Sequence, residues 1–108
     1  MIRVSTLFPN REGASFDMSY YMNSHMPMVR KRLGSALLRD ESWKSLRGPR
    51  DQRATYRVLQ HLYFDSPGTF NIAFHDHAQN IMADISSFTN VEPVIEVEDE
   101  LLLSLGSD

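Results

Sequence analysis

The chain begins with an alternation of apolar and polar positions that is typical of a β-strand. Over residues 2–8, Ile2, Val4 and Phe8 fall on one side of the alternation, and the other side is more polar. A proline and an asparagine follow and end the pattern. The sequence therefore predicts a first strand over residues 2–8.

A helical pattern replaces the alternation after a polar loop. Asp17 is a suitable N-cap, and Gly34 is a suitable terminator directly after Leu33. With a rotation of about 100° per residue, one arc of this helix is largely apolar and is expected to face the sheet. The arc contains Met28, Tyr21, His25, Val29, Met22 and Leu33. We therefore expect His25 to point toward the sheet.

Pro27 interrupts this helix two residues after His25. A proline has no amide to donate to the carbonyl of Asn23, and its ring crowds that turn. We expect a kink or pause that opens a cleft between helix and sheet. Two interpretations of His25 are possible from the sequence. It could be an imidazole that transfers protons in this cleft, or a hydrogen-bonded histidine of the core.

Two further strands are predicted in the middle of the chain. Residues 36–46 alternate poorly but have a suitable length, with Trp43 expected on the more buried side. Residues 56–64 are rich in aromatic and β-branched residues and give the strongest strand pattern. This strand ends with apolar residues on both faces, so its pattern does not decide which face His61 occupies.

The last third of the chain predicts a second helix and a final strand. Ser66 and Pro67 form an N-cap followed by a proline in the first helical turn. The final strand is expected over residues 91–103, with Pro93 near its start. The apolar stripe of the helix contains Phe70, Phe74, Ala78, Ile81 and Ile85.

The resulting order, βαββαβ, favours an α+β, ferredoxin-like fold in which both helices cover one face of an antiparallel sheet. The pattern indicates that the opposite face is too apolar to meet water, so we expect two copies to pack sheet against sheet as a homodimer. The length of 108 residues suits a single domain over residues 1–108.

Composition and charge exclude several classes of protein. The chain has no cysteine, which excludes disulfides, thiol nucleophiles and cysteine-ligated metals. A net charge of −3 gives no general attraction to nucleic acid, and we interpret the basic segment 47–57 as a solvated loop rather than a phosphate-binding patch. No glycine-rich phosphate loop is present, so no nucleotide cofactor is expected.

The expected location follows from the apolar runs and the start of the chain. No apolar run approaches the roughly 20 residues of a bilayer span, so no membrane association is expected. The strand pattern begins at Met1 and leaves no room for a signal peptide. We therefore expect a cytoplasmic protein.

Two more histidines, His75 and His77, resemble a metal motif only in sequence. Residues two apart on a regular helix lie about 200° apart, so both cannot bind one ion. We expect structural or surface roles for them and no metal site. Only the tertiary structure could combine one of them with His25 and His61.

Three segments together resemble the EthD family of the dimeric α+β barrel superfamily. They are YYMNSHMP after the first strand, HLYFDS at the end of the third strand, and HAQNIMADISSFTNVEPVIEV in the last third. The middle of the chain, residues 39–57, contributes little to the resemblance. The resemblance implies a ferredoxin-like protomer, a dimer with sheets face to face, and a pocket between helices and sheet.

The resemblance also implies a function, because relatives in the superfamily include decarboxylases, lactone isomerases, polyketide cyclases and quinone-forming monooxygenases, most of which need no organic cofactor or metal. We expect no cofactor, and acid/base conversion (oxidation, isomerisation or decarboxylation) of a small apolar or aromatic intermediate in catabolism. His25 would act as acid or base, His61 would orient an oxygen, and Tyr21 would donate a hydrogen bond to the developing anion. The substrate-binding residues would be Met28, Val29, Phe64 and Phe74.

A second hypothesis is a non-catalytic dimeric module that binds or delivers a hydrophobic intermediate to a degradation-pathway oxygenase. In that case His25 would only anchor the ligand. A third, haem- or metal-dependent oxidation, requires an axial histidine with an open site. The sequence does not separate the first two hypotheses.

Overall fold

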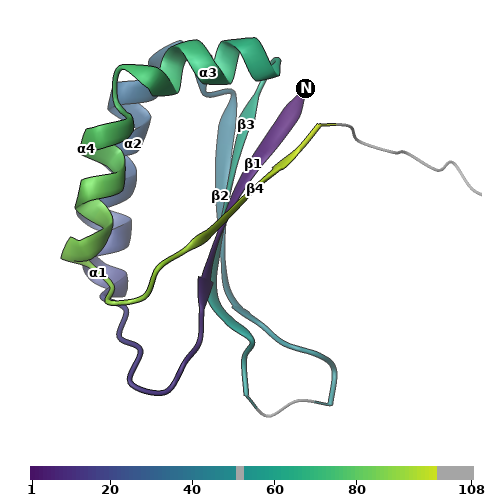
Figure 1. Cartoon of the computed structure of the whole chain (residues 1–108), viewed down its shortest axis with the longest axis vertical. Helices are drawn as coiled ribbons and strands as arrows, with labels where there is room; N and C mark the ends of the chain where they lie inside the picture. The colour runs from purple at the N-terminus through teal and green to yellow at the C-terminus, as the bar shows by residue number, and fades with distance from the viewer. Residues whose placement is uncertain (51–52, 100–108) are drawn as a thin grey trace, which may run out of the picture.

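The computed structural model describes residues 1–50 and 53–99, and its sheet has four antiparallel strands in the order β2-β3-β1-β4 (Figure 1). The strands are β1 (Ile2–Pro9), β2 (Arg39–Leu46), β3 (Tyr56–Phe64) and β4 (Val94–Glu98). The two strands with the strongest apolar patterns, β1 and β3, occupy the centre. This order confirms the predicted ferredoxin-like α+β fold.

All helices of the described chain cover one face of this sheet (Figure 1). The first helical segment comprises α1 (Met18–Tyr20), a π-helical turn (Tyr21–His25), α2 (Met26–Leu33) and a 3₁₀ turn (Gly34–Ala36). The second comprises α3 (Pro67–His75), α4 (Ala78–Asp84) and a 3₁₀ turn (Ile85–Ser87). None of these helices has the length and apolar character needed to cross a bilayer.

The predicted helix boundaries are confirmed by their capping contacts. The Asp17 carboxylate accepts a 3.0 Å hydrogen bond from the amide of Tyr20. Ser66 caps α3 in the same way, because its hydroxyl accepts a 3.1 Å bond from the amide of Thr69. Gly34 has a φ of +58°, a conformation that other residues adopt only with strain. Local sequence therefore sets where these helices begin and end.

The second helix differs from the prediction, because it is broken rather than continuous. The break falls at Asp76 and His77, where His77 has φ −121° and ψ −1° and leaves the helical region. In Figure 1, α3 crosses the end of the sheet and α4 runs alongside α2. The break allows Phe70 of α3 to pack on Phe64, with ring centroids 5.0 Å apart, while Ile81 of α4 enters the core.

The strand pairing assigns each side chain of the sheet to a face. Val4 pairs with Leu62 and Phe8 with Val58, and these residues belong to the core beneath the helices. The other face, here called the open face, carries the alternate residues of each strand. It consists of Arg3, Ser5, Leu7, Arg39, Glu41, Trp43, Leu59, His61, Tyr63, Val94, Glu96 and Glu98.

The two edge strands depart most from the predictions. The strand β2 begins at Arg39 rather than at residue 36, and Trp43 is 62% exposed on the open face, so its predicted burial is wrong for the single chain. The strand β4 spans only Val94–Glu98 of the predicted 91–103, of which 100–103 lie outside the described residues. An edge strand has one hydrogen-bonding neighbour, so its pattern is less constrained by burial.

Candidate active site

His25 lies in the π-helical turn that precedes Pro27. The amide of Met26 donates to the carbonyl of Tyr21, five residues back, instead of to the fourth residue back as in an α-helix. Pro27 cannot supply the next amide of an α-helical ladder, which favours this wider turn. The predicted pause beside His25 therefore takes the form of a π-helical turn, a feature that occurs frequently at functional sites.

The imidazole of His25 is bound to Asp84, the last residue of α4. Its Nδ1 lies 2.9 Å from Oδ2 of Asp84, with the His25 side chain 2% exposed and the Asp84 side chain 20% exposed. An ionised carboxylate only accepts hydrogen bonds, so Nδ1 carries the proton and Nε2 is left with its lone pair. Tyr20 donates a second hydrogen bond to Oδ1 of Asp84 at 2.7 Å. Asp84 thus fixes the orientation of the ring.

The environment sets the protonation of this pair. Burial lowers the pKa of His25 below its usual range, and the hydrogen bond and charge of Asp84 offset only part of that shift. For Asp84, partial burial acts to raise the pKa, but the hydrogen bonds from His25 and Tyr20 outweigh it, so that the pKa is lowered. At neutral pH the structure therefore holds a neutral imidazole beside an ionised carboxylate, the arrangement that a general base requires.

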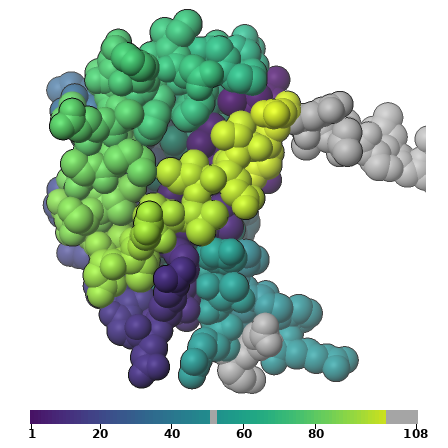
Figure 2. Space-filling model, viewed as in Figure 1, coloured from purple at the N-terminus to yellow at the C-terminus, as the bar shows by residue number. Residues whose placement is uncertain are grey.

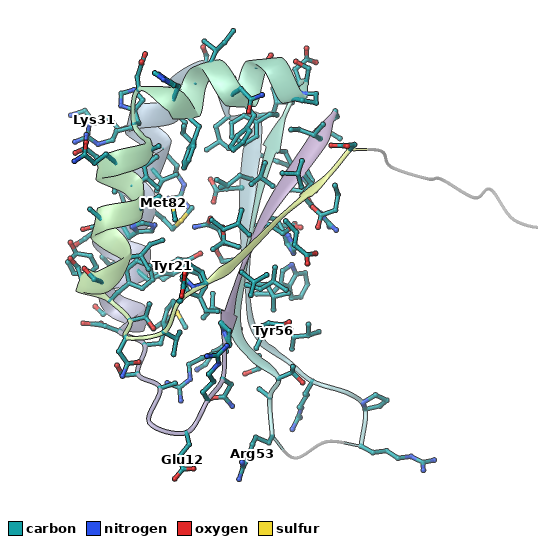
Figure 3. The ribbon with its side chains drawn as sticks, viewed as in Figure 1. Glu12, Tyr21, Lys31, Arg53, Tyr56 and Met82 are labelled. Atoms are coloured by element: carbon teal, nitrogen blue, oxygen red, sulfur yellow. The ribbon has the colours of Figure 1, made fainter. Side chains whose placement is uncertain are left out.

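His25 lines a small cavity of about 50 Å³ between the helices and the sheet. Its polar lining comes from His25, Thr6 and Gln60, and the rest of the wall is apolar. The apolar wall consists of Val4, Phe8, Val29, Leu62, Phe70, Phe74, Ile81, Met82, Ile85 and Ile95. Met82 and Ile95 are 39% and 45% exposed, so they lie where the cavity meets the surface; Figure 3 shows Met82 directed from α4 toward the sheet.

Tyr21 lies beside His25 rather than in the cavity wall. The two rings are stacked with centroids 5.9 Å apart, and the phenolic oxygen is 2.6 Å from Oγ of Ser42 on β2. Burial raises the pKa of Tyr21, and the hydrogen bond with Ser42 opposes that shift. Tyr21 therefore supports the face of the imidazole, and its hydroxyl is used to hold the helix against the sheet (Figure 3).

The four predicted substrate-binding residues divide into two pairs. Val29 and Phe74 line the cavity. Met28 and Phe64 are absent from its lining, and Phe64 is fully buried in the core. The π-helical turn explains part of this difference, because one extra residue in the turn shifts the phase of the helix. The shift buries Met26, which was not predicted, and leaves Met22 47% exposed.

His61 does not share a cavity with His25, so the single cleft expected to contain both histidines requires correction. His61 belongs to the open face, whereas His25 lies under the helices on the other side of the sheet. Nδ1 of His61 is 2.7 Å from Oγ of Ser5, and the same oxygen is 3.0 Å from both carboxylate oxygens of Glu98. Burial, and then the charge of Arg3, lower the pKa of His61.

The histidines of the second helix are also apart from the cavity. His75 has an 86% exposed side chain and lies 3.4 Å from Asp76, and His77 lies at the break between α3 and α4. Within residues 1–50 and 53–99, no group of three or more histidine, aspartate or glutamate side chains is arranged to hold a metal ion.

Asp84 is the site residue that sequence reasoning missed. It precedes Ile85 of the predicted apolar stripe, at the edge of the helix face that meets the core. A carboxylate beside a buried stripe is a weak signal, since most such residues face water. Its role depends on two helices meeting, which the pattern of either helix alone does not show.

Together, the sheet order and the buried histidine–aspartate pair define a ferredoxin-like α+β protein with a candidate acid/base site between helices and sheet. No protein-family model and no curated protein matches the sequence. The crystal structure of an EthD-like protein from Ralstonia eutropha JMP134 does match, with 32% identity, a TM-score of 0.86, and coverage of 96% of this chain and 95% of that one. The chain therefore belongs to the EthD family, as the three segments indicated.

Two more distant structures share the fold. One is an ethyl tert-butyl ether D (EthD) family protein from Bacillus halodurans C-125, with 15% identity, a TM-score of 0.66, and coverage of 94% of this chain and 99% of that one. The other is an antibiotic biosynthesis monooxygenase, with 12% identity, a TM-score of 0.52, and coverage of 94% and 100%. These two matches support the ferredoxin-like architecture alone.

Proposed function

We propose that this protein is a small cytoplasmic catabolic enzyme in which His25 acts as a general base on a compact apolar or aromatic molecule. The observation that carries the proposal is the 2.9 Å contact between His25 and Asp84 at the wall of a largely apolar cavity. It supplies a neutral imidazole and a carboxylate that stabilises the imidazolium, next to a largely apolar space.

The proposed step is removal of a proton from an activated C–H bond by Nε2 of His25. The electron pair of that bond moves into an adjacent carbonyl and forms an enolate. Asp84 then stabilises the positive charge on the ring through its bond to Nδ1. Isomerisation and cofactor-independent oxidation can both begin with such a proton abstraction. In a decarboxylation the enolate would instead form by loss of carbon dioxide, and protonated His25 would donate a proton to the carbon. The geometry supports this group of reactions without selecting one of them.

The side chains around the cavity suggest how a substrate would enter. A cavity of about 50 Å³ is smaller than the roughly 300–1,000 Å³ of most ligand sites, so only the reacting part of a molecule would fit inside. Met82 and Ile95 would contact the remainder at the surface. Thr6 and Gln60 are the polar groups available to orient a carbonyl oxygen.

A non-catalytic binding or accessory module is the second candidate. It is favoured by the small size of the cavity and by the hydrogen bonds that polar side chains around the cavity already make. The side chains of His25, Tyr21 and Gln60 each have a hydrogen-bonding partner, Gln60 through Sδ of Met26 at 3.1 Å. In this function His25 would anchor a ligand without moving a proton.

The proposed assembly is a homodimer formed through the open face. Leu7, Trp43 and Leu59 give this face an apolar component, but it is less apolar than its sequence pattern indicated. It also carries charges of both signs, including Arg3 and Glu98, which lie 3.3 Å apart. A surface with both signs can complement itself across a two-fold axis.

Proton abstraction can be tested before the physiological substrate is known. The protein is incubated in D₂O with 1-indanone and with an unsaturated lactone, and deuterium incorporation beside the carbonyl is followed by NMR. We expect catalysed exchange that is lost by ~100-fold or more in His25→Gln, the contribution typical of a general base. Lys31→Gln, which changes an exposed residue of α2, is the control that keeps the exchange.

The same experiment separates the two functions. Binding of these compounds without exchange would support the binding module. Exchange that survives in His25→Gln would show that His25 is not the base.

A further inference from the structure

A second hollow lies away from the His25 cavity, where the end of β1, the start of the first helical segment and the β2–β3 hairpin meet. Its volume is about 370 Å³, within the range of typical small-molecule sites. It is lined by Asn10, Phe16, Met18, Lys44, Ser45, Ala54 and Arg57. This hollow and the His25 cavity have no lining residue in common, and Tyr21, whose ring centroid lies 5.9 Å from that of His25 and 5.3 Å from that of Phe16, lines neither.

The backbone is irregular beside two of the residues that line the hollow. Ser45 has a φ of +68°, in the left-handed region that residues other than glycine rarely adopt. The pairing of β1 with β3 shifts between Phe8 and Pro9, so Arg57 lies opposite the irregularity. Strand irregularities of this kind occur frequently beside binding sites.

The hairpin arm that carries Arg57 is held in place by Asn10. The side-chain amide of Asn10 donates a 2.9 Å hydrogen bond to the carbonyl of Ala54, and its backbone amide donates a 3.0 Å bond to the carbonyl of Thr55. The amide of Thr55 in turn donates to the carbonyl of Leu46 at 2.8 Å. The hollow is therefore formed by fixed backbone on both of its sides.

Positive charge without a partner collects here, although the chain as a whole has a net charge of −3. Among residues 1–50 and 53–99, neither Lys44 nor Arg57 makes an ion pair or a side-chain hydrogen bond. An adjoining hollow also includes Asn10 and is lined by Arg11, Glu12 and Arg53. Figure 3 shows Glu12 and Arg53 at this end of the molecule, far from Lys31.

The same hollow also has an apolar wall. Phe16 packs edge to face on Phe8 and Phe88, with centroids 5.3 Å and 5.2 Å away, and Met18 extends the same wall. Two cations and an aromatic wall in one hollow match a ligand that has an anionic head and an apolar body. An inorganic anion would use only the cations, and a neutral hydrocarbon would use only the wall.

We propose that this hollow binds a small organic carboxylate, with the carboxylate against Lys44 and Arg57 and an aromatic or aliphatic body against Phe16 and Met18. The site is distinct from the His25 cavity. It gives Lys44 and Arg57 a role beyond that of cations in a solvated loop.

The test uses the ¹⁵N-labelled full chain at fixed ionic strength, titrated with benzoate and followed by its backbone amide signals. We expect saturable shifts at Ser45, Ala54 and Arg57. Benzamide lacks the charge, and acetate lacks the ring, so each should bind at least about fivefold more weakly than benzoate. Lys44→Gln and Arg57→Gln should each weaken benzoate binding about fivefold, the upper range for a partly exposed ion pair.

Lys31→Gln is the matched control, because it removes one exposed positive charge from α2. It should leave the benzoate affinity unchanged. His25→Gln should also leave it unchanged, so the benzoate titration tests the carboxylate site independently of the proposed role of His25 as general base. Absence of saturable shifts would overturn the proposal. So would phosphate binding as tightly as benzoate at the same residues, or an equal loss of affinity in Lys31→Gln.

Discussion

Nδ1 of His25 lies 2.9 Å from Oδ2 of Asp84, although 59 positions separate the two residues in the sequence. One residue comes from the π-helical turn before Pro27 and the other from the end of α4. The pair therefore forms only when both helical segments pack on the same face of the sheet. This contact turns a buried histidine into an oriented base, and it gives the first prediction.

Replacing Asp84 with asparagine should lower the pKa of His25 further. Burial already lowers it, and the charge and hydrogen bond of Asp84 oppose that effect. The measurement is an NMR titration of the His25 ring proton signals in both proteins. Lys31→Gln is the control with an unchanged His25 titration, and a pKa that rises in Asp84→Asn would contradict the assigned electrostatics.

Stability should fall as the pH drops below neutrality. The pKa values of His25 and His61 are lowered in the folded chain relative to the value of about 6.5 expected when unfolded. The unfolded state then binds more protons between that value and the folded pKa values, so the stability present above pH ~6.5 is lost as the pH falls through this window. Urea unfolding at pH 7.5 and 5.5 measures the loss.

His25→Gln provides the control for this pH dependence. It removes one of the two titrating groups, so its stability should change less between the two pH values than that of the unaltered protein. An identical change in both proteins would show that His25 does not contribute.

The open face offers a second electrostatic test. The positive charge of Arg3 is the second cause, after burial, of the lowered pKa of His61. Arg3→Gln should therefore raise the pKa of His61, and the loss of the 3.3 Å pair with Glu98 leaves a carboxylate that acts in the same direction. An NMR titration of His61 in both proteins checks this. A pKa of His61 that stays the same or falls in Arg3→Gln would contradict the effect assigned to the charge of Arg3.

Phe64 and Phe74 should respond differently to truncation. Phe64 is fully buried in the core, so Phe64→Ala should lower the free energy of unfolding by about 3–5 kcal/mol. Phe74 is half-buried at the cavity wall, so Phe74→Ala should lower the free energy of unfolding by clearly less than Phe64→Ala does. Urea denaturation of both variants compares them. Equal losses would mean that Phe74 is as much a part of the core as Phe64.

The proposed dimer can be broken at Trp43, which is 62% exposed on the open face. We expect sedimentation of the unaltered protein to give twice the 12.4 kDa chain mass and Trp43→Glu to give a monomer. Ile72→Glu is the matched control, because Ile72 is 77% exposed on α3 and lies outside the open face. A monomeric unaltered protein would contradict the assembly.

In Figure 2, β4 lies beside α4, and the described part of the hairpin between β2 and β3 projects at the lower end of the molecule, away from α3. The hollow lined by Lys44 and Arg57 and the mouth of the cavity, with Met82 and Ile95, are therefore separate parts of the surface. Each can be altered without the other.

The sequence by itself determined the element order and most helix boundaries. Asp17, Gly34, Ser66 and Pro67 act on backbone groups within a few residues of themselves, so their effects could be predicted without the rest of the chain. It also determined the approach of His25 to the sheet, because one turn of helix relates it to Tyr21 and Val29. Capping depends on residues that are close in sequence, and the direction of a helical side chain follows from the helical repeat, so both can be predicted from a short segment.

Only the tertiary structure decided the rest of the site. The face of His61 follows from its pairing with Ser5, since its neighbours along the strand are apolar on both sides. The partner of His25 follows from α4 packing beside α2, and the burial of Met26 follows from the π-helical turn. Contacts between distant segments depend on how whole helices and strands pack together. The pattern of apolar and polar residues within one segment does not determine that packing.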